Sequence, residues 1–405
     1  MLKLATKKDC TGCAACANVC SKSAITMQAD EEGFLQPYID VEQCVECGLC
    51  EKRCPALHPL NPKPKEQRAY AIINFADRKL SSSGGAFSLF ARYVLNQGGA
   101  VFGATIDEKL QVFHTKIEKV DDLKKLRGSK YVQSDIGDIY QEVKKELRAE
   151  KNVLFCGSPC QVAGLYAFLG QRNEDKLITL DLVCHGVPNQ AIFNAYLRKL
   201  KNSPRLKAGE KNIEEFRFRK LDSWDYRPAV KFAKSKWQRL EQEDNAYMSA
   251  FFRGITYRES CFKCRYANLN RVGDFTIADF WGIGRHGKTF KKNVASGVSL
   301  VLDNRGTMAK LHRELEKNTY IEEREVSEAV VENCNLHDTV KRLPERNSAI
   351  KDMLDDSISL RTFGAKYHLL KKENWMHSLV KYGKDLIYAL GLYNVYKTLI
   401  YKIGK

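Results

Sequence analysis

Two runs of cysteine constrain this chain more than any other feature of its sequence. The stretch CTGCAACANVC has C-x2-C-x2-C-x3-C spacing, and CVECGLCEKRCP repeats that spacing directly before Pro55. Three thiolates at this spacing can bind three irons of one 4Fe-4S cubane, whereas the fourth lies too far along the chain and must reach another cluster. The spacing therefore predicts two clusters that exchange a ligand, one held by Cys10, Cys13, Cys16 and Cys54 and the other by Cys20, Cys44, Cys47 and Cys50.

Zinc knuckles are the alternative for these thiolates, because zinc also binds four cysteines tetrahedrally. Zinc sites typically use pairs of C-x2-C elements. The third and fourth cysteines of each run would have no role in such a site. Residues 1–57 resemble bacterial two-cluster ferredoxin domains over their whole length, with Ser21 where the first run would often carry proline. Between the runs, residues 24–40 alternate apolar and polar side chains about Gly33, which predicts a short hairpin.

The length, the 14 cysteines and the N-terminal residues bound the class of protein. A chain of 405 residues suggests two or three domains. The opening MLKLATKKDC contains no apolar signal-peptide core, so a reducing, cytoplasmic compartment is expected, and metal binding is favoured over disulfides. No apolar run approaches the roughly 18–20 residues of a membrane-spanning helix, so we expect a soluble or membrane-peripheral chain.

Beyond a proline-rich linker at residues 58–68, the pattern of the chain changes. Residues 69–345 alternate apolar strand patterns with amphipathic helices. Strands are expected at 69–76, 98–106, 152–156, 177–184, 214–220 and 229–233, and helices at 85–97, 135–150 and 191–201. This order predicts a larger α/β domain with a mixed sheet, preceded by the α+β ferredoxin-like two-cluster domain.

Four more cysteines of the larger domain stand at informative places. VLFCGSPCQVAG and LVCHGVPN put Cys160 and Cys184 at strand ends, where ligands tend to bind in α/β folds, and RESCFKCRYA adds Cys261 and Cys264. Together they could ligate a third cubane, although spacing alone leaves buried free thiols or a zinc site equally open. Cys156 and Cys334 would then be spare, but Cys156 lies near enough to Cys160 for the two to exchange roles.

KLSSSGGAFSLF puts small residues before a helix, where amides can approach a phosphate, although a simple helix cap is as common.

Six ordered motifs identify the larger domain by resemblance. SSSGG, GSKYVQS, CGSPCQVAG, DLVCHGVPN, SCFKCRYA and GDFTIADFWGIG resemble the coenzyme F-420 hydrogenase and dehydrogenase beta-subunit family between Arg68 and Asn335. The resemblance implies FAD beside a 4Fe-4S cluster, with Cys160, Cys184, Cys261 and Cys264 as cluster ligands. It also implies two flavin-binding loops, formed by Ser82, Ser83, Gly84 and Gly85 and by Gly128, Ser129, Lys130 and Tyr131. Ala278 is a departure, because members with GDFWG have glycine there.

The function implied by this resemblance is that of an iron-sulfur flavoprotein oxidoreductase. Electrons would pass from a one-electron carrier such as ferredoxin through the 4Fe-4S clusters to the flavin, and then to an organic two-electron acceptor or the deazaflavin coenzyme. The alternative is a non-catalytic electron-transfer subunit that feeds a separate enzyme. No catalytic residue is assigned: His185 could deliver a proton near the flavin, or simply orient the neighbouring thiolate.

The formal charge of +17 raises the question of partners. FRFRKLDSWDYRP interleaves basic and aromatic residues as a single-strand nucleic-acid groove would, but the chain has no recognised nucleic-acid motif. A basic surface serves equally to dock an acidic redox protein or a phosphorylated cofactor, which we favour. Residues 346–405 are expected to form a basic helical tail whose last part could lie on an anionic membrane or pack on the domain.

Overall fold

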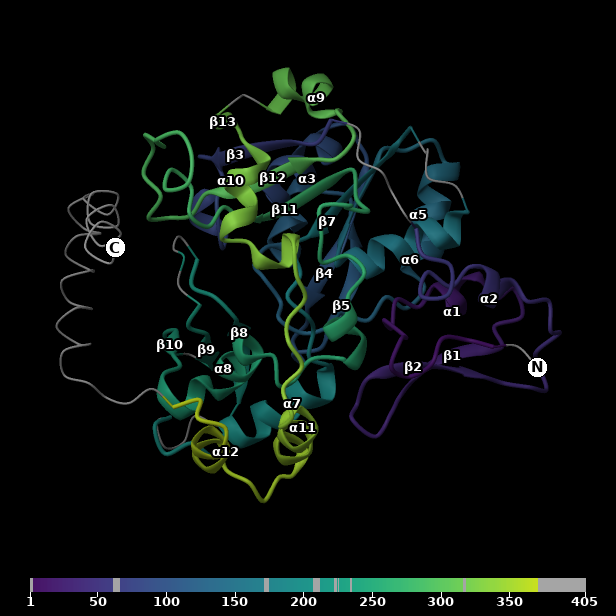
Figure 1. Cartoon of the computed structure of the whole chain (residues 1–405), viewed down its shortest axis with the longest axis vertical. Helices are drawn as coiled ribbons and strands as arrows, with labels where there is room; N and C mark the ends of the chain where they lie inside the picture. Colours follow the sequence, from purple (N-terminus) through teal and green to yellow (C-terminus); the bar gives the residue numbers. More distant parts are fainter. Residues whose placement is uncertain are drawn as a thin grey trace.

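A small N-terminal domain lies at one edge of a larger body (Figure 1). The computed structural model describes residues 3–60, 66–170, 175–206, 212–221, 224, 226–233, 235–315 and 318–370. In the small domain, helices α1 (Ala15–Val19) and α2 (Leu49–Lys52) flank an antiparallel hairpin of strands β1 (Ile25–Ala29) and β2 (Leu35–Ile39). Asp30 Oδ1 accepts the amides of Glu32 and Phe34 and closes the hairpin turn, as the alternating pattern predicts.

An eight-stranded mixed sheet forms the centre of the body. Its order is β13-β3-β12-β11-β7-β6-β4-β5, and β4, β6, β7 and β11 run parallel while the other pairings are antiparallel. The mixed sheet expected from the sequence is thus confirmed. The strands are β3 (Arg68–Asn74), β4 (Ala100–Ile106), β5 (Val112–Ile117), β6 (Val153–Gly157), β7 (Leu177–Leu182), β11 (Phe275–Asp279), β12 (Ser299–Asp303) and β13 (Thr319–Arg324).

Helices cover both faces of this sheet because alternate strand residues are apolar on each side. One core packs α3 (Ala86–Asn96), α4 (Leu123–Leu126) and α9 (Met308–Leu315) on Val101 and Leu154. On the other face, α5 (Ile139–Arg148) and α6 (Pro159–Leu169) pack on Phe102 and Phe155, and α10 (Val326–Val331) lies near β3. Short 3-10 helices are η1 (Arg78–Leu80), η2 (Val120–Asp122), η3 (Gln242–Asn245), η4 (Glu259–Lys263) and η5 (Cys334–Leu336).

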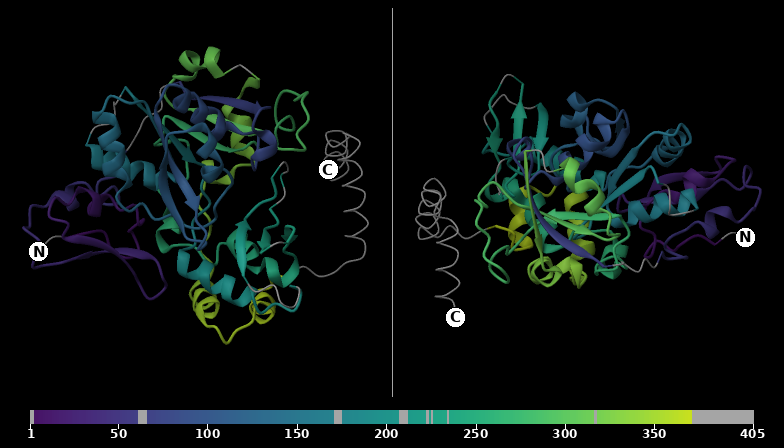
Figure 2. Two further views of the ribbon diagram at one scale, coloured as in Figure 1. Left: turned by 180° about the vertical axis from the view of Figure 1, so that it is seen from behind. Right: turned by 90° about the horizontal axis from the view of Figure 1, so that it is seen from above.

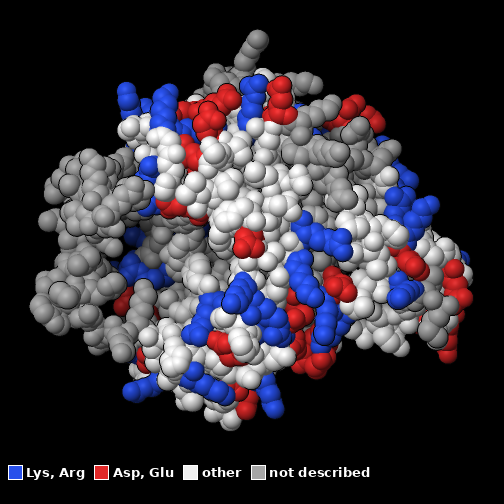
Figure 3. Space-filling view, in the orientation of Figure 1, with Lys and Arg blue, Asp and Glu red and all other residues white. Residues whose placement is uncertain are grey.

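A second lobe projects below the sheet in Figure 1. It contains a three-stranded antiparallel sheet with the helices α7 (Gln190–Leu200), α8 (Ala246–Arg253), α11 (Arg346–Leu354) and α12 (Leu360–Lys366). Its strands are β8 (Ile213–Arg217), β9 (Ala229–Phe232) and β10 (Gln238–Arg239). On the face shown in Figure 3, Lys and Arg side chains gather over this lobe.

The start of the expected tail is part of this lobe. Helix α11 packs on α7, and α12 packs on α7, α8 and η3. Residues 371–405, which include the segment considered for membrane contact, lie outside the described residues, as do residues 61–65 of the expected linker. Within the described ranges, the helices are too short or too polar to cross a membrane.

The N-terminal domain is packed against the body through α1 and its hairpin turn. Helix α1 lies against α6, and Gly164 permits this approach because a side chain there would meet Cys13. At the hairpin, Phe34 is buried and Glu32 pairs with Arg346 of α11. The views in Figure 2 show the same domain beside α5 and α6 from two further directions. Clusters held in this domain would therefore sit close to the body.

Gly84 is expected to be one of the least replaceable residues of the fold. A Cβ there would lie 2.1 Å from the carbonyl oxygen of Ile72 and 2.4 Å from the amide of Ser299, both fixed in the sheet. We expect Gly84→Ala to lower the free energy of unfolding by about 1–3 kcal/mol or more, the cost of overpacking. Urea unfolding followed by circular dichroism measures this. Gly103→Ala, whose Cβ would make only ordinary contacts at 3.5 Å or more, is the matched control and should change stability far less.

Candidate functional site

The first predicted cysteine set, Cys10, Cys13, Cys16 and Cys54, surrounds one small cavity lined otherwise by apolar residues such as Met27 and Pro37. Gly12 and Ala14 adopt left-handed conformations between the cysteines, with φ of 65° and 59°. These turns curl the chain so that its thiols face a common centre. Burial, with repulsion from the thiolates of Cys10 and Cys54, raises the pKa of Cys16 to about 12. Loading such a site requires the thiols to release their protons to the solvent.

The second set, Cys20, Cys44, Cys47 and Cys50, lies nearer the surface. Cys50 is buried, Cys20 and Cys44 are half-buried and Cys47 is exposed. Burial raises the pKa of Cys50, and the neighbouring thiolates of Cys20 and Cys47 raise it further. Gly48 turns the chain between Cys47 and Cys50 with φ of 69°, as Gly12 does in the first run. Of the two sets in this domain, the second is therefore the outer one.

The third set comes from three separate segments of the body and meets at one cavity of about 80 Å³. Cys160 stands in the first turn of α6, Cys184 follows β7, and Cys261 and Cys264 lie in and directly after η4. Burial raises the pKa of Cys160 to about 11 and of Cys261 to about 12, and neighbouring thiolates add to both shifts. Four half-buried thiols that repel one another when ionised have the chemistry to bind a polynuclear iron core.

The structure separates Cys156 from this set. Cys156 lines the large cavity described below, whereas Cys160 lines the cavity shared with Cys184. The sulfurs of the third set surround a space rather than meet at a point, as a cubane requires because each thiolate binds a different iron. In the described ranges, no three His, Cys, Asp or Glu side chains converge closely enough to hold a single metal ion together. Cys160, rather than Cys156, therefore lines the same cavity as the other three cysteines of the third set.

The cavities are arranged in a row. Thr11 and Ala56 line both the cavity of the first set and that of the third set. On its other side, the cavity of the third set shares Cys184, His185, Gly186 and Val187 with a larger cavity. The three spaces are therefore separated by single layers of residues.

This larger space, the inner cavity, has a volume of about 310 Å³ and lies at the carboxyl ends of the parallel strands β6, β7 and β11. Cys156, Leu182 and Ala278 come from these strands. Its volume falls within the range of about 300–1,000 Å³ typical of small-molecule sites. Ligands in α/β folds bind at such strand ends, so the inner cavity is the candidate cofactor site.

Comparison with known proteins supports this division of the chain. Residues 9–57 match the 4Fe-4S dicluster domain family, and residues 150–329 match the family described as the C terminus of the coenzyme F420 hydrogenase/dehydrogenase beta subunit. The similarity to this beta-subunit family thus covers residues 150–329, which are less than half of the chain. A chain of the F420-reducing [NiFe] hydrogenase complex from Methanosarcina barkeri is similar in structure, with 15% identity, a TM-score of 0.43, and coverage of 74% of this chain and 91% of that chain. No curated protein sequence matches the chain.

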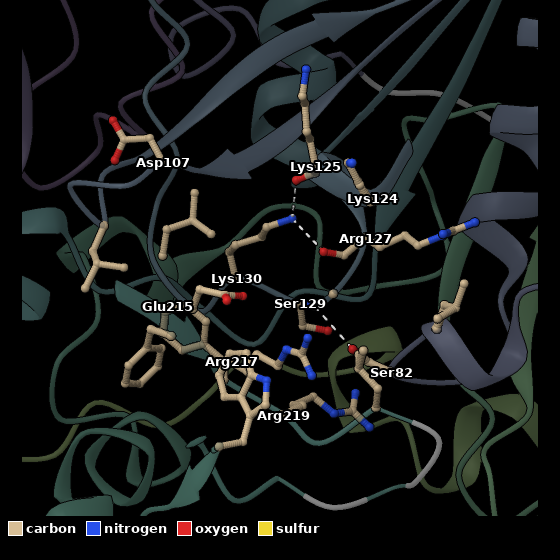
Figure 4. A pocket seen from close by; sticks show the side chains of 18 of the residues that line it. Ser82, Asp107, Lys124, Lys125, Arg127, Ser129, Lys130, Glu215, Arg217 and Arg219 are labelled. Atoms are coloured by element: carbon tan, nitrogen blue, oxygen red, sulfur yellow. Dashed lines mark hydrogen bonds between the residues drawn. The ribbon is translucent and has the colours of Figure 1, made fainter. Parts of the chain in front are cut away.

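Both loops expected to hold flavin in this beta-subunit domain face the inner cavity. Ser82, Ser83 and Gly85 line it from the first loop, and Gly128 to Tyr131 line it from the second. The amide of Ser129 donates to Ser82 Oγ at 3.4 Å and links the loops (Figure 4). Gly84 is the exception, because it packs against the backbone of β3 and β12 and does not line the cavity.

Lys130 makes hydrogen bonds within its own segment of the chain. Its ammonium donates to the carbonyl oxygens of Leu126 at 2.9 Å and Arg127 at 3.0 Å, at the end of α4. Burial lowers the pKa of Lys130 to about 7. The side chain thus fastens its own loop to α4 while lining the cavity.

An outer chamber of about 390 Å³ opens from the inner cavity past Ser82, Ser129, Lys130 and Arg219, which line both. Figure 4 shows Lys124, Lys125 and Arg127 around one side and Arg217 and Arg219 around another. The guanidinium of Arg217 stacks over the ring of Trp237 at 4.0 Å. Asp107, Glu108, Glu214 and Glu215 also line the chamber, so its wall is rich in both signs of charge.

A polar cluster around Asp279, in the wall of the inner cavity, was not predicted from the sequence. Asp279, at the end of β11, accepts from Arg219 Nη1 at 2.8 Å, Trp224 Nε1 at 3.1 Å and the Tyr226 hydroxyl at 3.0 Å. The stretch FRFRKLDSWDYRP, considered above for nucleic acid, supplies these three side chains. Arg219 Nε and Nη2 are buried without a hydrogen-bond partner. Because Arg219 lines both spaces, acceptor atoms of a bound flavin or substrate would satisfy these donors.

His185 lies in the wall between the cavity of the third set and the inner cavity. Burial lowers the pKa of the His185 ring, and the carboxylate of Asp279 opposes this shift. This position is compatible with both roles considered for it, proton delivery and orientation of the neighbouring Cys184.

Proposed function

We propose that the chain is an iron-sulfur flavoprotein oxidoreductase that exchanges electrons between a one-electron carrier such as ferredoxin and an organic two-electron acceptor. The observation that carries this proposal is the row of cavities, in which neighbouring spaces share Thr11 and Ala56 or Cys184 and His185. The cavity of the first set, the cavity of the third set and one ligand-sized cavity are neighbours in an order that would suit such a relay. The two motif matches, to a dicluster domain and to a beta-subunit domain, agree with the same order.

Each part of the row has a residue-level role. The first two sets would hold the clusters of the dicluster domain, and Cys160, Cys184, Cys261 and Cys264 would hold a third. The loops at Ser82 to Gly85 and Gly128 to Tyr131 would hold FAD in the inner cavity. A bound flavin would supply the conversion between single electrons and electron pairs, which clusters alone cannot perform.

The outer end of the row suits a redox protein. Cys47 is exposed, and the nearby apolar side chains of Tyr38, Val41 and Val45 are 57%, 81% and 60% exposed. Exposed apolar groups around a redox centre favour transient contact with a partner. At the opposite end, the outer chamber offers Lys125, Arg127 and Arg217 to an anionic organic acceptor, of which a deazaflavin coenzyme is one example.

Anaerobic turnover tests this function. The purified protein, with its iron, sulfide and flavin content measured, is mixed with reduced ferredoxin, and the visible absorbance of the flavin is followed. We expect the flavin to be reduced and a small organic acceptor then to be consumed catalytically. Flavin reduction with acceptor turnover only after a partner enzyme is added would assign the chain instead as an electron-transfer subunit. Absence of flavin from the anaerobically purified protein would refute the proposal.

A further inference from the structure

Arg258 joins the dicluster domain to the beta-subunit domain. Its side chain is 1% exposed, and its three nitrogens donate to Gln133 Oε1 at 2.9 Å and to the carbonyl oxygens of Cys10 at 3.2 Å and Leu35 at 2.9 Å. The guanidinium also lies 5.0 Å from the centre of the Phe34 ring. Gly12 makes room for it, because a Cβ there would lie 2.6 Å from Arg258 Nη2.

The acceptors around Arg258 are all neutral, which sets it apart from the other buried arginines. Those pair with carboxylates, in the pairs Arg219 with Asp279, Arg271 with Asp181, Arg324 with Glu328 and Arg346 with Glu32. Across the described ranges, Arg258 has no carboxylate within ion-pair distance. Burying a cation without a counter-ion is energetically costly. A negatively charged group other than a carboxylate of the polypeptide should therefore lie next to Arg258.

Cysteine thiols that would carry negative charge as cluster ligands lie near Arg258 in both the first and the third set. Its guanidinium side chain lines the cavity of the third set, together with Cys160 and Cys261, and holds the backbone of Cys10 in the first set. Burial raises the pKa of Cys10, and attraction to Arg258 is the largest opposing influence. Arg258 also favours the thiolates of Cys160 and Cys261. A 4Fe-4S core with four thiolates carries net negative charge, which would supply the missing counter-ion.

We infer that Arg258 is the shared counter-ion of the first and third clusters and that it sets their reduction potentials. The inference rests on the third cluster of the proposed function. An electron added to either cluster increases its negative charge, so a fixed cation between them stabilises both reduced states. Arg258 is thus a positioning residue for electron transfer across the domain boundary. Ser260 Oγ also donates to the carbonyl oxygen of Cys10, at 3.0 Å, and so supports the contact between Arg258 and Cys10.

Redox titration monitored by EPR on the fully loaded protein tests this inference. We expect Arg258→Gln and Arg258→Met to lower the midpoint potentials of the first and third clusters by 59 mV or more, a tenfold change for a one-electron couple, and to leave the second cluster unchanged. Arg258→Lys keeps the charge and should retain most of the wild-type potentials. Arg346→Gln is the matched control, because Arg346 faces the same Phe34 ring at 5.7 Å but pairs with Glu32.

The possible outcomes separate this inference from the proposed function. Unshifted potentials in Arg258→Gln and Arg258→Met, with all clusters present, would overturn the inference and leave the relay intact. Equal shifts in Arg258→Lys and Arg258→Gln would also overturn it, because they would indicate hydrogen bonding rather than charge. A wild-type protein without a third cluster would instead refute the relay, independently of the variants. If the neutral variants do not assemble, Arg258→Lys with wild-type potentials supports the inference, and a lowered potential overturns it.

Discussion

If the proposed third cluster is present, a Cys184→Ser variant is expected to contain about eight irons, against about twelve expected for the wild-type protein with three 4Fe-4S clusters. Cys184 directly follows β7 and is part of the wall between the cavity of the third set and the inner cavity. Its side chain is half-buried, and burial and the thiolates of Cys261 and Cys160 raise the pKa of its thiol. A serine hydroxyl there offers iron a far poorer ligand, so the third cluster should be lost while the dicluster domain keeps both of its own.

Cys156→Ser is the matched control for this loss. Cys156 precedes Cys160 by four residues and is also half-buried, but it lines the inner cavity rather than that of the third set. We therefore expect Cys156→Ser to retain about twelve irons. Iron and sulfide analysis with EPR of the dithionite-reduced proteins measures both variants. Loss of four irons from Cys156→Ser and none from Cys184→Ser would show that the ligand assignment is wrong.

The fold was most predictable where local pattern alone determines the structure. Cysteine spacing and the alternation about Gly33 predicted the dicluster domain and its hairpin, because ligand reach and a two-residue period are local properties. Strands β11 and β12 were not predicted. Each is only five residues long, and its place in the centre of the sheet is determined by pairing with segments distant in sequence, such as β7 and β3. Short apolar runs do not carry that information by themselves.

The site was predictable to a similar extent. Strand ends and the C-x2-C pair suggested four cysteines that line one cavity in the structure, and the two loops expected together from the family motifs line another. The charged partners were not predicted: Asp279 meets Arg219 across 60 residues, and Arg258 meets Cys10 across 248. In a sequence such residues cannot be distinguished from solvated surface charges, because only the fold decides which of them lose contact with water. Their burial therefore became visible only in the structure.

An Ala278→Trp variant is expected to lose flavin and keep iron. Ala278 pairs with Leu300 in the centre of the sheet and lines the inner cavity, at the position where the family motif GDFWG has glycine. A tryptophan side chain at this wall would occupy much of a space of about 310 Å³ and exclude a planar ring. We expect flavin content to fall at least tenfold, with iron remaining at about twelve per chain. Absorbance of flavin released on denaturation, together with iron analysis, measures the two quantities.

Ala278→Gly is the control for Ala278→Trp, since it restores the family residue and should bind flavin as the wild type does. Full flavin content in Ala278→Trp would mean that flavin lies elsewhere. If iron is lost as well, the sheet has been disrupted, and Ala104→Trp, from the edge of the same cavity, takes its place. We expect Ala278→Trp to lose flavin and retain iron, and Cys184→Ser to lose iron and retain flavin. This reciprocal result is what two adjacent but separate sites require. A common loss of both cofactors in both variants would instead mean that the two sites assemble as a single unit.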